Sequence, residues 1–162
     1  MNPFFETYDT TFGTIPFTKI NITHYVPAVN KGIEEAKSEV DAIVSNTDAP
    51  TFTNTLEALE DSGETLTKVT SAFFNLNSAE TSDEMQAIAQ EISPLLTAHG
   101  NEVAMNVGLF ARVKAVYEGD QSKLTTEQKT LLEKSYKGFA RNGANLNEAD
   151  KEKLKAIDTK KA

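Results

Sequence analysis

Apolar residues recur at steps of three and four positions along most of the chain, the period that brings side chains to one face of an α-helix. The first such stripe runs from Val26 to Val44, and Pro27 falls in the first turn, where its missing N–H costs no hydrogen bond. A group of turn formers predicts the end of this helix: Asn46, Asp48 and Pro50. A second helix is predicted over residues 53–77, and Gly63 in its middle indicates either a bend or a closely packed neighbour.

Four further helices follow. A capping box of Thr81 and Glu84 predicts the start of the third helix, and Pro94 is expected to kink it before it frays or ends at residues 100–101. A short helix is predicted over residues 109–118. A second capping box, Thr125 with Gln128, starts the next helix, and Asn142 with Gly143 is predicted to end it. The last helix starts near Asn147 and has only a thin apolar stripe, Leu154 and Ile157.

Residues 1–22 differ from the rest because they show no helical period. They contain Pro and Gly turn formers and four aromatic side chains: Phe4, Phe5, Phe12 and Phe17. We therefore predict an extended N-terminal arm whose rings anchor on a surface, since an exposed arm of this kind would be a liability. The predicted organisation is this arm over 1–22 and one helical domain over 23–162. The fold class is all-α, an antiparallel bundle of five to six helices joined by short connections.

Composition narrows the classes of function. The 162 residues contain no cysteine, which excludes disulfides, thiolate metal sites and cysteine nucleophiles. The net charge is −8, with 6 Lys/Arg against 17 Asp/Glu in residues 1–119 and a weakly basic remainder. An acidic chain repels phosphate backbones, so we expect no nucleic-acid partner.

No stretch is long and apolar enough to predict a membrane span, so no membrane partner is expected. The first residues lack the basic start and apolar run of a signal peptide. These features favour the cytoplasm, and the periplasm stays open if Met1 replaces a removed signal.

The residues that could carry chemistry do not form a recognisable catalytic set. The only histidines are His24 and His99, and neither HExxH, a Gly-rich phosphate loop nor GxSxG occurs. We interpret His24 as a capping or interface residue and His99 as a residue at the edge of the core; a hydrolase built on either is a remote alternative. The adjacent carboxylates 34–35 and 60–61 are interpreted as solvated helix faces. We therefore predict no catalytic residue and no metal ligand, and the substrate-binding residues are unknown.

Residues 73–77, Phe-Phe-Asn-Leu-Asn, form the densest aromatic and amide segment. Its two Asn side chains could face a ligand channel. The interpretation we favour places Phe73 and Leu76 in the core and lets Asn75 and Asn77 end the helix.

Seven segments in order resemble the start of the thimet-oligopeptidase-like zinc metallopeptidases, most closely the bacterial peptidyl-dipeptidases, also called dipeptidyl carboxypeptidases. They are NPFFETYDTTFGTIPF (2–17), HYVPAV (24–29), APTFTNTLEALEDSGETL (49–66), FFNLNSAET (73–81), AIAQEISPLL (87–96), LFARVKAVYE (109–118) and LLEKSYKGFARNGANL (131–146). The resemblance covers nearly the whole chain.

The resemblance implies a mostly helical enzyme whose two halves flank a deep channel, with zinc and a catalytic Glu in an HExxH motif far downstream. This chain would be the non-catalytic N-terminal part that walls the channel and limits access to short peptides. Its partner would be the catalytic half, and the parent would release C-terminal dipeptides. No cofactor is expected in this chain, and no catalytic residue can be carried over to it. The alternative is a free-standing helical protein-binding module that reuses the fold.

Overall fold

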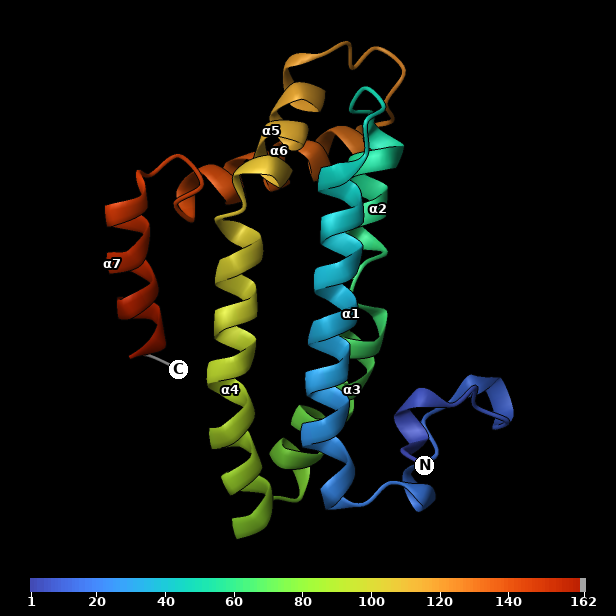
Figure 1. Ribbon diagram of the computed structural model, residues 1–162. Coiled ribbons are helices and arrows are strands. Elements are labelled where there is room, and N and C mark those ends of the chain that lie inside the picture. The colour runs from blue at the N-terminus through green and yellow to red at the C-terminus, as the bar shows by residue number, and fades with distance from the viewer. Residues whose placement is uncertain (161–162) are drawn as a thin grey trace. The chain divides into compact units, whose positions relative to one another are not determined.

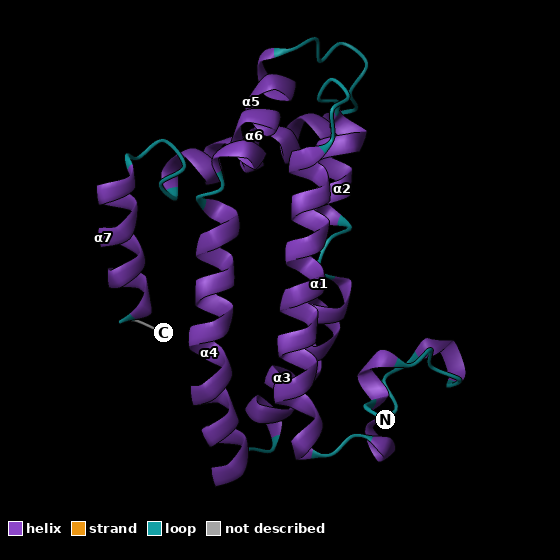
Figure 2. Ribbon diagram, in the orientation of Figure 1, coloured by secondary structure: helices purple, strands orange, loops and turns teal. Residues whose placement is uncertain are grey.

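A computed structural model describes residues 1–160, and within that range the secondary structure consists of helices and turns without strands (Figures 1 and 2). The main α-helices are α1 (Tyr25–Ser45), α3 (Glu64–Ala79), α4 (Asp83–Ala104), α5 (Val107–Glu118), α6 (Thr126–Arg141) and α7 (Glu148–Thr159). A π-helix, η5 (Phe52–Glu57), continues into the single turn α2 (Ala58–Glu60). The prediction of an all-α bundle of five to six helices is confirmed.

The chain forms two compact units. The first contains residues 1–37 and 63–96, and the second contains residues 38–62 and those from 97 onward. The residues of the arm therefore belong to the first unit. The domain boundary after residue 22 stays a prediction.

An aromatic row organises the core of the first unit. The Phe4 ring lies 5.5 Å from the Tyr25 ring, which meets the Phe73 ring edge-on at 5.1 Å. Edge-to-face pairs at these distances add to the stabilisation that burial supplies. Around this row pack small and β-branched side chains of α1, α3 and α4: Ala28, Val29, Val69, Ala72 and Ile92.

The core of the second unit is built around α5. Its buried residues come from the end of α1, from η5, from α5 and α6, and from the turn after α6: Val40, Ile43, Phe52, Leu56, Leu109, Phe110, Val113, Val116, Leu132, Phe139 and Ala144. Tyr136 links two aromatic contacts, because its ring stacks on Tyr117 at 4.1 Å and on Phe110 at 5.7 Å. The stripes predicted for these helices therefore face this core.

The predicted helix 53–77 is interrupted, and this prediction is wrong in its middle. The π-helix and α2 end at Glu60, and α3 begins only at Glu64. Gly63 adopts the left-handed conformation (φ 73°), which glycine reaches at no steric cost and which a helix cannot contain. The start is displaced as well, since Thr51 and Asn54 form the capping box.

Other helix ends confirm or correct single predictions. The Thr125–Gln128 capping box is present, with Gln128 N–H donating to Thr125 Oγ1 at 3.2 Å. The predicted box at Thr81 is wrong, because Ser82 Oγ caps the helix by accepting from Met85 N–H at 3.2 Å. α4 continues through Pro94 and past residues 100–101 to Ala104.

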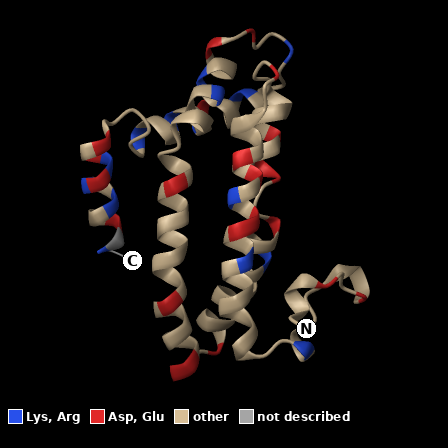
Figure 3. Ribbon diagram, viewed as in Figure 1, with Lys and Arg blue, Asp and Glu red and all other residues tan. Residues whose placement is uncertain are grey.

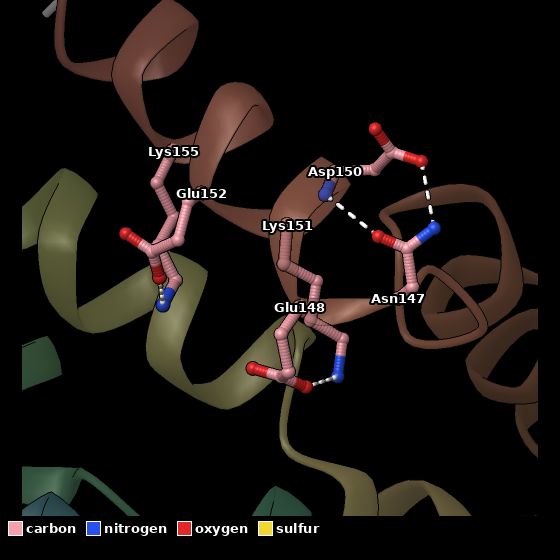
Figure 4. Close-up of polar contacts among 6 residues, drawn as sticks. All are labelled: Asn147, Glu148, Asp150, Lys151, Glu152 and Lys155. Carbon is pink, nitrogen blue, oxygen red and sulfur yellow. Dashed lines mark hydrogen bonds and ion pairs between the residues drawn. The ribbon is translucent and has the colours of Figure 1, made fainter.

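The last helix begins where the sequence predicts. Asn147 Oδ1 accepts from the Asp150 N–H at 3.0 Å, as Figure 4 shows. Hydrogen bonds from Lys153 and from Asn147 hold the pKa of the Asp150 carboxyl below its usual value. Lys151 on this helix is buried, since it is 3% exposed, and its Nζ lies 3.2 Å from Glu148 Oε1.

Close packing of α1 on α3 generates a stability prediction. A Cβ at Gly32 would stand 2.8 Å from the Leu66 Cα, so neighbouring backbone would have to move. Gly32→Ala should lower the free energy of unfolding by about 1–3 kcal/mol. Gly100→Ala is the control, because a Cβ there meets nothing within 4 Å, and it should raise that free energy by about 0.5–1 kcal/mol. Urea unfolding followed by circular dichroism measures both free energies of unfolding. Changes of the same sign in the two variants would contradict the close packing at Gly32.

Burial of Tyr25 generates a pH prediction. Burial raises the pKa of its phenol above the ordinary value of 10.0, because the folded state disfavours the phenolate. The stabilisation is therefore complete below pH 10 and is lost as the pH rises through the raised pKa. Thermal melts from pH 8 to 11 should show an alkaline loss of stability that Tyr25→Phe reduces. Parallel alkaline profiles for the two proteins would argue against a buried phenol.

Candidate functional site

His24 serves as a capping residue at the start of α1. Its Nδ1 accepts from the Asn21 backbone N–H at 3.1 Å, and its carbonyl accepts from Asn2 Nδ2 at 2.8 Å. The side chain thereby completes a capping box with Asn21, and the carbonyl ties the arm to the helix. The capping interpretation of His24 is confirmed.

His99 lies on α4, partly buried, and lines a cavity of about 410 Å³ in the second unit. The remaining lining comes from α4 and α6 and their ends: Gly100, Val103, Ala104, Ser135, Gly138, Phe139 and Asn142. His99 thus sits at the edge of the core, as interpreted from the sequence. The cavity offers an apolar wall and one imidazole.

The ligand set of a hydrolytic zinc needs three or more converging side chains. Among residues 1–160, no three His, Cys, Asp or Glu side chains are placed so that they could hold a metal ion. His24 and His99 belong to different units. The residues that the structure describes therefore do not fit a zinc site.

The adjacent carboxylates lie on exposed faces. Glu34 and Glu35 flank Lys31 Nζ at 3.7 Å and 3.5 Å as neighbours one turn apart. Such exposed pairs contribute little to stability. Glu60 and Asp61 are also exposed and border a cavity of about 550 Å³ in the second unit. The interpretation of both pairs as solvated faces is confirmed.

The segment 73–77 divides between core and surface. Phe73 is fully buried and Leu76 packs against the same core. Asn75 bonds back to the Ser71 carbonyl at 2.7 Å, and Asn77 accepts from Thr81 Oγ1 at 2.8 Å. The core assignment is confirmed, whereas the two amides do not end the helix, because α3 runs on to Ala79.

Arg112 is the polar residue that sequence reasoning missed. It is 8% exposed, and its guanidinium donates to the Asn46 carbonyl at 2.7 Å, the Asp48 carbonyl at 3.3 Å and Asn54 Oδ1 at 3.0 Å. Asn54 in turn holds the Ala49 carbonyl through its Nδ2 at 3.0 Å. Arg112 therefore clamps the connection between α1 and η5. A signal in the sequence could have found it, because Arg112 lies between the apolar residues Phe110 and Val113 of one helix. A buried charge at such a position requires hydrogen-bond partners.

The tip of the arm is a turn closed on itself. Gly13 N–H donates to the Thr10 carbonyl at 3.0 Å, and Thr14 donates to the Thr11 carbonyl through its N–H at 3.5 Å and its Oγ1 at 3.1 Å. Thr10 Oγ1 also bonds the Thr14 carbonyl. At the centre, Phe12 adopts φ 60° and ψ 20°, a left-handed conformation that costs a bulky residue about 1–2 kcal/mol.

The prediction that four Phe rings anchor the arm is correct for one ring. Phe4 is buried in the first core, while Phe12 is 98% exposed and Phe5 and Phe17 are about half exposed. Beside the arm lies a cavity of about 650 Å³. Tyr8 borders it, with Lys68 Nζ 5.2 Å from the ring centroid, and burial raises the pKa of the Tyr8 phenol.

Comparisons with known proteins find peptidases that are similar to this chain over part of their own length. It is 40% identical over 163 residues to the dipeptidyl carboxypeptidase of Escherichia coli, an alignment that covers 100% of this chain and 24% of that protein. It is 27% identical to oligopeptidase A of the same organism, over 93% of this chain and 22% of the relative. A thimet-like oligopeptidase of Dictyostelium discoideum is 30% identical over 68% of this chain and 17% of its own length.

The chain is a homologue of the thimet-oligopeptidase-like peptidases. It spans about a quarter of the length of its dipeptidyl carboxypeptidase relative. No protein-family model matches the sequence. Of the helices in residues 1–160, none combines the length and hydropathy that crossing a bilayer would take.

The Arg112 clamp generates a prediction. Arg112→Ala leaves the Asn46 and Asp48 carbonyls without their charged donor, and should lower the free energy of unfolding by about 3 kcal/mol. Lys114→Ala on the same helix removes an exposed pair with Glu118 and should change it by less than about 0.5 kcal/mol. Chemical denaturation compares the two variants; similar losses would show that Arg112 is not a clamp.

Proposed function

We propose that this chain is the non-catalytic N-terminal helical domain of a zinc-dependent oligopeptidase of the peptidyl-dipeptidase type. The observation that carries the proposal is 40% identity over the whole chain to a dipeptidyl carboxypeptidase that is about four times as long. The alignment leaves no large region of this chain unmatched, as expected for a domain that two enzymes share. The weaker relation to oligopeptidase A has nearly the same extent and supports the same boundary.

In this proposal the zinc ion and the groups that activate water belong to the part of the enzyme beyond the matched region. When bound, the zinc supplies the Lewis acid and the activated water for peptide hydrolysis. The residues of this chain take no part in those steps. Their role is to position the second wall of the substrate channel and to exclude folded proteins from it, so that only short peptides enter.

The helices suit this role because they are long and firmly terminated. α4 has 22 residues and would extend about 33 Å. Side-chain caps at Asn106, Thr125 and Asn147 satisfy the exposed N–H groups at the starts of α5, α6 and α7. A wall that selects by size must resist deformation, and capped helices with filled cores provide that resistance.

A chimera tests the proposal directly. This chain replaces the matched region of the E. coli dipeptidyl carboxypeptidase, and the product is incubated with an unstructured oligopeptide and with a folded protein. We expect release of C-terminal dipeptides from the oligopeptide alone. Mass spectrometry of the products measures it, with the intact E. coli enzyme as the positive control.

The isolated chain is the matched negative control. Purified with a chelator and then supplied with zinc, it should release no dipeptide, because the catalytic groups lie outside it. A folded chimera that leaves the oligopeptide intact would reject the proposal. Stoichiometric zinc binding and dipeptide release by the isolated chain would reject it equally.

A further inference from the structure

The N-terminal arm presents aromatic side chains that its own unit leaves uncovered. Phe12 is almost fully exposed, and Phe5 and Phe17 are about half exposed, although Phe4 of the same arm is buried. Figure 3 shows that the arm carries few charged residues. Residues 10–18, Thr-Thr-Phe-Gly-Thr-Ile-Pro-Phe-Thr, contain none. The segment is therefore a neutral strip with two exposed rings, whose chemistry suits an apolar surface.

The backbone of the turn is strained at Phe12. Phe12 occupies a left-handed conformation that Gly or Asn adopts readily, and the turn is held closed by hydrogen bonds among Thr10, Thr11, Gly13 and Thr14. The hydrogen bonds of the turn hold this conformation, whereas the Phe12 ring is 98% exposed and adds no packing to it. Strain at a bulky residue points to a function that requires the ring at that place.

We propose that the Phe12 turn is a docking plug, whose ring inserts into an apolar pocket on the part of the full-length peptidase that lies beyond the matched region. This inference rests on the proposed function and adds to it the surface through which the N-terminal domain is held. The closed turn holds the Phe12 backbone in one conformation, so little backbone freedom is lost on docking. Phe17 extends the apolar contact along the arm.

Two observations favour this occupant over a second copy of the chain. About three quarters of the dipeptidyl carboxypeptidase relative lies outside the match, so a large partner surface exists in the homologue. The net charge of −8 makes two copies of this chain repel each other. An uncharged turn with the exposed Phe12 ring suits an uncharged, concave surface better than a second acidic copy of this chain.

Chymotrypsin, which cuts after aromatic residues, tests whether the arm is covered. In the isolated chain, cleavage after Phe5, Phe12 and Phe17 should be rapid. In the chimera described above, cleavage at these sites should slow by about tenfold or more, since cleavage tracks the population of exposed arm. Cleavage of the isolated chain is followed over a range of concentrations to detect self-association.

A substitution with opposite expected effects gives the sharper test. Phe12→Asn keeps a residue that tolerates the turn and removes the ring. In the isolated chain it should raise the melting temperature by about 2–4 °C, because strain is relieved. In the chimera it should restore fast cleavage after Phe17. Thr7→Ala, at an exposed position of the arm outside the turn, is the control and should change neither measurement.

Each outcome of these experiments supports or overturns the proposed docking of the Phe12 turn. Slow cleavage in the chimera and its loss in Phe12→Asn support docking. An active chimera whose arm is cut as fast as in the isolated chain overturns the docking plug and leaves the proposed function standing. Protection of the isolated chain that grows with concentration assigns the turn to a second copy and overturns the inference. A folded chimera that releases no dipeptide rejects the proposed function and the inference together.

Discussion

The left-handed conformation at Gly63 is the constraint that ends one helical segment and lets the next begin. A helix cannot continue through a residue with φ 73°, so η5 and α2 end at Glu60 and α3 begins at Glu64. On one side of this break Leu56 belongs to the core of the second unit, and on the other side Val69 and Phe73 belong to the core of the first. Any residue with a Cβ would be strained at this positive φ, so glycine is the residue that permits the break.

Each unit closes its core by a different means. The first relies on an aromatic row in which Phe4, from the arm, covers Tyr25, and on a close approach of α1 to α3 at Gly32. The second relies on α5, whose Arg112 bonds the carbonyls of the connection after α1 and so satisfies a loop that packing alone would leave without donors. Polar and apolar interactions are therefore both required to complete the fold.

These cores leave aromatic rings of the arm uncovered. The homologues are about four times as long as this chain, and uncovered rings are the kind of surface that a longer enzyme would use. Polar side chains, by contrast, are engaged in caps, turns and exposed ion pairs. In the proposed function this domain contributes shape and a docking surface, and the catalytic groups belong to the rest of the enzyme.

The sequence by itself determined the helical class, several helix boundaries and the relation to a peptidase family, and it offered capping as one of two roles for His24. These follow from local periodicity, from short-range hydrogen bonds and from ordered sequence blocks. Only the tertiary structure decided that Ser82 caps α4 in place of Thr81, that Gly63 breaks a helix, and that Arg112 and Lys151 are buried. It also separated Phe4, which is buried, from Phe12, which is exposed, although both are aromatic residues of one arm. The physical reason is that burial depends on which distant segments approach a side chain, and a one-dimensional pattern does not contain that information.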